Sequence, residues 1–163
     1  MKARRGFTLT EMMVVIAIIA ILAMIALPSY LDRIIKAQIE GSIPLADIAK
    51  RAVSAYRDAT QDFPADNTAA ALPVPDKIVN NYVSAVAVDK GVINLTFGNR
   101  ANKAIAGKVL SLRPAVVDDA PIVPITWVCG SAEAPDKMSV KGQDSTTLDP
   151  VYMPIECRAL KKG

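Results

Sequence analysis

An unbroken apolar run near the N-terminus constrains the fold of this chain more than any other feature. From Met12 to Leu27 the sequence has no charged or polar side chain, no glycine and no proline. Between Phe7 and Leu27 only Thr8, Thr10 and Glu11 interrupt the run. As a helix, residues 7–27 would span about 31 Å, the thickness of the hydrocarbon core of a bilayer. The sequence therefore predicts a membrane-inserted N-terminus that carries a soluble domain.

Composition narrows the function classes. The chain has 163 residues and no histidine, which excludes Ser-His-Asp and Cys-His catalysis and most zinc sites. It has 19 basic and 16 acidic side chains, and the excess equals Lys2, Arg4 and Arg5, so the basic balance is weak evidence for a nucleic-acid partner. The sequence contains no paired nucleophile and base, no phosphate-binding glycine loop and no metal-ligand cluster. We therefore expect a protein that is not an enzyme and has no cofactor.

The flanks of the apolar run argue against an ordinary signal peptide. Its alanines fall at positions 17, 20, 23 and 26, so no Ala-x-Ala cleavage site exists, and the run continues through Pro28 into more helical sequence. The basic residues before it would keep the N-terminus cytoplasmic and place residues 29–163 outside. A plain transmembrane anchor remains an alternative.

The junction before the run is more specific. Residues 4–11 read RRGFTLTE, which resembles the processing site of type IV prepilins: a short basic leader, here residues 1–6, that ends in glycine before an apolar helix. The resemblance implies that a prepilin peptidase cleaves between Gly6 and Phe7 and that Phe7 is then N-methylated. The apolar segment, residues 7–28, would stay in the mature protein as a transmembrane and filament-core helix.

Glu11 has two compatible interpretations. A carboxylate in an apolar helix is costly in a membrane and usually has a partner. The resemblance implies that the amine of Phe7 on a neighbouring subunit neutralises Glu11 during assembly, and this role is favoured. The local alternative is a capping box, because Thr8 and Glu11 have the spacing in which each side chain satisfies the helix start.

Beyond Pro28 the apolar residues recur every three or four positions, which predicts an amphipathic helix over residues 29–59 that continues into the globular domain. Pro28 should kink the helix, and Gly41 and Pro44 mark a second weak point. Residues 60–81 are expected to form a connecting loop.

Four strands are predicted in the remainder, at residues 82–88, 92–97, 109–113 and 125–129, with a turn at Lys90-Gly91 and with Pro114 ending the third strand. The predicted fold is α+β: a long N-terminal helix packed on a four-stranded antiparallel β-sheet. The order of these elements, and the ending YMPIECR at residues 152–158, is similar to the globular domain of type IVa pilins. Residues 82–163 would hold the sheet and a C-terminal loop.

Cys129 and Cys157 are the two cysteines of the chain. Both lie in the part predicted to be exported, where a disulfide is the economical interpretation and two free buried thiols are the alternative. The resemblance to type IVa pilins implies that a disulfide closes the C-terminal loop.

Other candidate sites are weak. Asp118, Asp119, Asp144 and Asp149 lack regular calcium-ligand spacing and are better explained as solvated loop carboxylates. Trp127 is expected in the core, and the sequon at Asn94 is expected to be fortuitous. A basic patch could bind DNA weakly; it would comprise Arg100, Lys103, Lys108, Lys161 and Lys162.

The resemblance implies a structural subunit of a type IV pilus, with a major pilin favoured, that forms a helical homo-oligomeric filament supporting adhesion and twitching-type motility. The precursor would sit in the inner membrane with its globular domain in the periplasm, and the assembled fimbrium would be extracellular. The implied partners are the prepilin peptidase and the pilus assembly machinery. The alternatives are a type II secretion pseudopilin, a minor pilin acting as a DNA-uptake receptor, and an unprocessed anchor protein.

Overall fold

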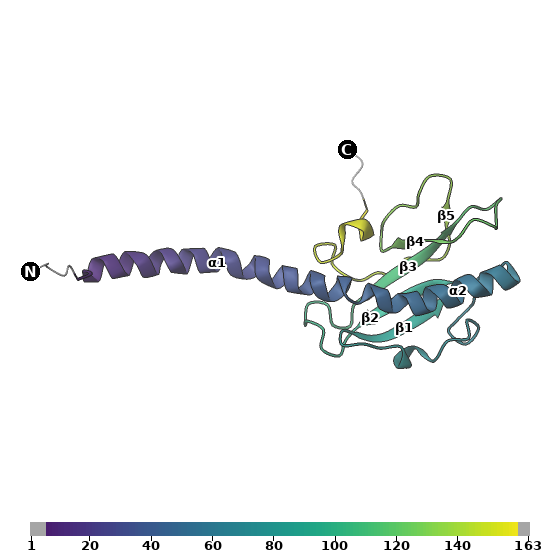
Figure 1. Cartoon of the computed structure of the whole chain (residues 1–163), viewed down its shortest axis with the longest axis horizontal. Helices are drawn as coiled ribbons and strands as arrows, with labels where there is room; N and C mark the ends of the chain where they lie inside the picture. Colours follow the sequence, from purple (N-terminus) through teal and green to yellow (C-terminus); the bar gives the residue numbers. More distant parts are fainter. Residues whose placement is uncertain (1–5, 160–163) are drawn as a thin grey trace, which may run out of the picture. The chain divides into compact units, whose positions relative to one another are not determined.

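The computed structural model describes the backbone of residues 6–159, and all of their side chains except those of residues 26–29. The chain divides into two compact units, Met1–Ile34 and Ile35–Gly163. Its helical part consists of α1 (Leu9–Glu40), the 3-10 turn η1 (Ile43–Ala46) and α2 (Asp47–Thr60), and an antiparallel sheet follows (Figure 1). The predicted α+β fold is confirmed.

The helical part is interrupted once within the second unit. The backbone of α1 is helical through Pro28, whose side chain lies outside the description, so the kink there stays a prediction. After Glu40 the helix expected over residues 29–59 breaks. Pro44 has no N–H to donate to the Glu40 carbonyl, and the Ser42 hydroxyl donates to the Gln38 carbonyl at 2.7 Å. α2 ends at Thr60, and the next residue, Gln61, takes a left-handed conformation with φ 60°.

Four strands pair in sequence order: β1 (Val83–Asp89), β2 (Val92–Phe97), β3 (Val109–Val116) and β4 (Thr126–Cys129). Lys90 and Gly91 join β1 to β2 with φ values of 48° and 83°, as a tight hairpin turn requires. Because neighbouring strands are antiparallel, the β1–β2 turn and the β3–β4 connection lie at one end of the sheet, and the β2–β3 loop lies at the other (Figure 1).

The prediction that Pro114 ends the third strand is wrong. β3 continues to Val116, with Pro114 opposite Trp127 of β4. On the other edge the β2 register stops at the pair Ile93 and Leu112, so no β2 carbonyl needs an N–H from Pro114. A short strand that was not predicted, β5 (Ser139–Val140), pairs with the last two residues of β3. Two residues are too few to give a recognisable alternation.

The core lies between the helices and the sheet. Its helical side consists of buried residues at the predicted three- and four-residue spacing: Ile35, Ile39, Ala46, Ala49 and Val53. These side chains belong to the same buried cluster as Val86, Ile93, Leu95, Leu110 and Leu112 of the sheet. The two alanines, Ala46 just before α2 and Ala49 in its first turn, contribute small, fully buried side chains to this core.

A buried side chain closes part of the open edge of β1. The Nδ2 group of Asn67 donates to the carbonyls of Val86 at 3.0 Å and Pro73 at 2.9 Å. Its Oδ1 accepts from the backbone N–H of Val88 at 2.6 Å. Asn67 therefore occupies donor and acceptor positions that a further strand would otherwise take.

Candidate assembly surfaces

The start of α1 is closed by a capping box. One carboxylate oxygen of Glu11, Oε2, accepts from the backbone N–H of Thr8 at 2.7 Å and from the Thr8 hydroxyl at 2.8 Å. In return, the N–H of Glu11 donates to the Thr8 hydroxyl oxygen at 3.3 Å. The local role considered for Glu11 is therefore present. Its other oxygen, Oε1, accepts no hydrogen bond within residues 6–159, and the Phe7 side chain beside it is 79% exposed.

The apolar segment has no cover. Every side chain from Gly6 to Ile25 is exposed, including the alanines at positions 17, 20 and 23; Ala26 belongs to the residues whose side chains are not described. The helical stretch from Leu9 to Thr60 includes a window long and apolar enough to cross a membrane, judged by length and composition. A surface of this kind requires lipid or other apolar helices around it.

Cys129 and Cys157 form a disulfide with an S–S distance of 2.04 Å and Cα atoms 4.5 Å apart. Two arginines form hydrogen bonds that help to hold the ends of the loop between Cys129 and Cys157. Arg113 of β3 donates to the carbonyls of Gly130 at 2.7 Å and Ala132 at 3.1 Å. Arg158 donates from two guanidinium nitrogens to the Met153 carbonyl, at 2.9 and 2.6 Å. The loop is thus tied at both ends by hydrogen bonds as well as by sulfur.

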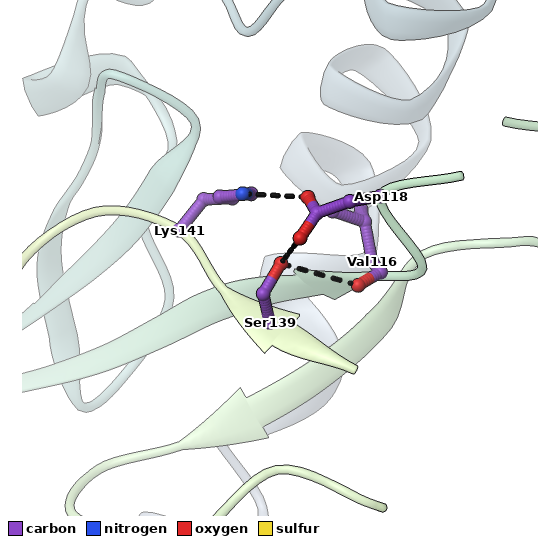
Figure 2. A network of polar contacts seen from close by, with 4 residues as sticks. All are labelled: Val116, Asp118, Ser139 and Lys141. Atoms are coloured by element: carbon purple, nitrogen blue, oxygen red, sulfur yellow. Dashed lines mark hydrogen bonds and ion pairs between the residues drawn. The ribbon is translucent and has the colours of Figure 1, made fainter. Parts of the chain in front are cut away.

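A polar network joins this loop to the end of β3 (Figure 2). Asp118 accepts from the Lys141 ammonium at 2.7 Å and from the Ser139 hydroxyl at 2.7 Å, and that hydroxyl also lies 3.4 Å from the Val116 carbonyl. The hydrogen bond from Lys141, then the hydrogen bond from Ser139 and, less strongly, the charge of Lys141 lower the pKa of Asp118 below its usual value. Asp118 therefore fixes the start of the β3–β4 connection.

Comparison of the sequence with known proteins identifies its family. Residues 36–158 match the family described as Pilin (bacterial filament), and residues 1–27 match the prokaryotic N-terminal methylation motif. The type IV major pilin protein PilE1 of Neisseria gonorrhoeae is 37% identical over 161 residues, covering 95% of this chain and 87% of the relative. The chain belongs to the pilin family.

Two further relatives agree with this assignment. A fimbrial protein of Neisseria meningitidis is 34% identical over 95% of this pilin and 94% of its own length. The fimbrial protein EcpC of Eikenella corrodens is 37% identical over 96% of this pilin and 92% of its own length. This pilin is accordingly a structural protein that assembles into filaments, not an enzyme, and its N-terminal motif is that of chains processed as prepilins.

The weaker candidates of this pilin have local explanations where the structure describes them. Asp144 and Asp149 each accept from a backbone N–H two residues further on, at 2.9 Å, as turn-forming aspartates do. Asn94 accepts from the buried Ser111 hydroxyl at 2.6 Å within the sheet. Trp127 is half-buried against the core. Lys161 and Lys162 lie outside the described residues.

The cations of the predicted basic patch that the structure describes share one loop. Arg100, Lys103 and Lys108 all lie exposed between β2 and β3. The Gln38 side chain of α1 anchors this loop by accepting from the Asn102 N–H at 2.9 Å. Sequence reasoning missed this anchor, together with Asn67 and the two arginine clamps. The contacts of Gln38, Asn67 with β1, and Arg113 join residues far apart in the chain, so no local pattern could have indicated them. Arg158 bonds a main-chain carbonyl five residues before it, which no side-chain pattern marks.

Proposed function

We propose that this pilin is the major structural subunit of a type IV pilus, made as a precursor anchored in the inner membrane and displayed outside the cell after assembly. Relatives named as type IV major pilins cover 95% of the chain, which supports this function. The observation that carries it is the fully exposed apolar half of α1, because such a helix needs a bilayer before assembly and neighbouring helices afterwards.

Processing is the first step of the proposed mechanism. A prepilin peptidase removes the leader, residues 1–6, by cleavage between Gly6 and Phe7, and Phe7 is N-methylated. A Cβ added at Gly6 would meet no atom within 4 Å, so no contact within residues 6–159 requires glycine there. The glycine is therefore better explained by recognition in the peptidase.

Pairing between subunits is the second step. The new amine of Phe7 carries a positive charge and approaches Glu11 of a neighbouring subunit. The Thr8 contacts occupy Oε2 and leave Oε1 for this amine, so capping and pairing can coexist. Pairing neutralises a carboxylate in apolar surroundings and sets the axial register of the subunits.

The filament then follows from the two units of the chain. The apolar helices, residues 7–28, leave the lipid with the help of the pilus assembly machinery and bundle in the filament core, where the small residues at positions 17, 20 and 23 allow close approach. A bend at Pro28 would adjust each helix to its neighbours. The rest of each chain, residues 29–163, covers the outside, where the filament supports adhesion and twitching-type motility.

Mass spectrometry of material sheared from the cell surface tests this function. We expect a chain that begins at N-methylated Phe7 and is two hydrogens lighter than the dithiol. The same processed chain found only in membranes would favour a pseudopilin or a scarce minor subunit. A chain that still carries residues 1–6 would contradict the proposal.

Weak DNA binding is a second candidate, favoured by the three exposed cations on the β2–β3 loop. Such binding would neutralise phosphates and fall steeply with salt. A gel-shift measurement tests it: loss of the shifted band in R100A, K103A or K108A variants would support a DNA-uptake role, and wild-type protein that shifts no band at low salt would contradict it.

A further inference from the structure

The loops at the two ends of the sheet differ in charge, and the exposed Asp149 lies near the first of them, because the Leu148 N–H donates to the Val109 carbonyl at 3.3 Å. At one end the β2–β3 loop holds Arg100, Lys103 and Lys108, and no carboxylate occurs in the sequence between Asp89 and Asp118. These three cations are exposed, and none of them forms an ion pair within residues 6–159. We call this loop, residues 98–108, the basic end.

Carboxylates gather at the opposite end. The β1–β2 turn begins at Asp89, and the β3–β4 connection begins with Asp118 and Asp119. The segment after α2 reaches the same turn, because the N–H groups of Lys90 and Gly91 donate to the carbonyls of Ala65 and Pro64 at 3.0 and 2.9 Å. We define the acidic end by its exposed carboxylates: Asp58, Asp62, Asp66, Asp89, Asp118 and Asp119. Arg57, Lys90 and Lys141 lie among them and offset only part of this charge.

An exposed apolar side chain lies at the acidic end, and a partly apolar pocket, lined by no residue of the basic end, lies on the same globular unit. Ile122, in the β3–β4 connection, is 92% exposed, and Pro121 and Pro124 bracket it. Near the start of α2 there is a pocket of about 370 Å³. Its apolar wall includes Ile43, Pro44, Leu112, Trp127 and Pro154, with Glu40, Lys50 and Glu156 around it. The Asp118 network fixes the start of the connection that carries Ile122, which lowers the entropic cost of docking it (Figure 2).

We propose that the acidic end of one subunit docks on the basic end of the next in the filament, with Ile122 seated in the neighbour's pocket. This inference rests on the proposed pilus function. The contact joins two different surfaces of the same chain, so it is heterologous and does not close on itself, as a filament requires. Charge complementarity sets the direction of the contact and opposes stacking of two like ends.

Charge reversal in a piliation-competent host tests this contact. We expect the basic-end variant R100E/K103E and the acidic-end variant D89K/D119K each to lower the yield of sheared filaments at least about fivefold, since each brings like charges together. The chain that combines all four substitutions restores complementarity and should recover most of the yield. Matched controls reverse exposed charges outside both sets of residues, in the single variants K77E and D76K, and should assemble normally.

The outcomes separate this contact from the other proposals. Wild-type yield in both single-end variants, or no recovery in the combined variant, would overturn the contact while leaving the pilus function intact. Normal filaments from R100E/K103E with loss of DNA binding would assign the basic end to nucleic acid and overturn the contact. A wild-type chain that forms no filaments in this host would count against the pilus function itself, and the contact would fall with it.

Discussion

Thr8 donates both its backbone N–H and its hydroxyl to a single oxygen of Glu11, at 2.7 and 2.8 Å. The carboxylate therefore closes the start of its own helix with one oxygen and presents the other. Local capping and pairing between subunits are compatible roles that the sequence alone does not separate. In this geometry they use different atoms and can be tested separately.

Substitution of Glu11 by glutamine should separate the two roles. Glutamine keeps an oxygen that can accept from Thr8, so the cap survives, but it removes the charge that would attract the Phe7 amine. We expect E11Q to insert in the membrane normally and to reduce filament yield as strongly as E11A, measured on sheared surface material. The variant T8V, which loses the hydroxyl and keeps the charge, should still assemble. Normal piliation in E11Q would rule out pairing through charge.

Removal of the disulfide should destabilise the globular unit substantially. On the chain-entropy account, closing a loop of 28 residues stabilises the fold by about 3–4 kcal/mol. We expect C129S/C157S to lose about this much in denaturant unfolding of the detergent-solubilised chain. Reductant should lower the stability of the wild type toward that of the variant and leave the variant unchanged. Equal stability of the two chains under oxidising conditions would show that the Arg113 and Arg158 clamps suffice.

Two glycines with similar backbone angles should respond differently to alanine. Gly91 has φ 83°, and a Cβ there would lie 2.6 Å from Cδ1 of the Phe63 ring; Gly107 has φ 75° and open space around it. G107A should cost about 1 kcal/mol in unfolding free energy from backbone strain alone. G91A should cost at least about 1 kcal/mol more, because the ring must move. Equal losses of unfolding free energy in the two variants would mean that the Phe63 ring moves aside without a measurable energetic penalty.

Removal of the Asn67 side-chain amide should strongly lower the free energy of unfolding. N67A would leave the N–H of Val88 and the carbonyls of Val86 and Pro73 without their partner, and an unsatisfied buried group costs about 1–3 kcal/mol. We expect a loss of at least about 3 kcal/mol in denaturant unfolding. The matched variant N81A, at an exposed asparagine, should change stability by less than about 0.5 kcal/mol. A similar small loss in N67A would mean that water replaces the amide.

The Asp118–Lys141 pair predicts a pH dependence with a definite sign. The folded chain lowers the pKa of Asp118, so the stability that this carboxylate contributes is present above its unfolded-state pKa and is lost as the pH falls through the lowered folded-state value. D118N should therefore be less stable than wild type at neutral pH, and the difference should shrink in acid. Thermal unfolding from pH 7 down to pH 2 measures it. D119N, which breaks no ion pair within residues 6–159, should not show this convergence.

The sequence predicted the helices, strands and turns that have a regular local residue pattern. The helical spacing of Ile35, Ile39 and Ala49, the alternation of the strands and the Lys90-Gly91 turn each depend on neighbouring residues, and the structure contains them. The prediction at Pro114 was wrong because a proline can lie within a strand only where no neighbouring strand needs its N–H. Whether that holds depends on where β2 stops pairing with β3, which is a property of the assembled sheet. The predicted site at Gly6, Phe7 and Glu11 rests on a motif, and its roles between subunits await experiment.

The closure of β1 by Asn67 has a consequence for a chain that assembles into filaments. An unpaired strand invites the same strand of another molecule, and densely packed precursors in a membrane would meet repeatedly in parallel orientation. With Val86 and Val88 already bonded to a side chain of their own subunit, that route to irregular aggregates is obstructed from the moment of folding. Filament assembly can then proceed through the contacts that produce an ordered fibre. The buried amide of Asn67 thus helps to prevent irregular aggregation of concentrated subunits.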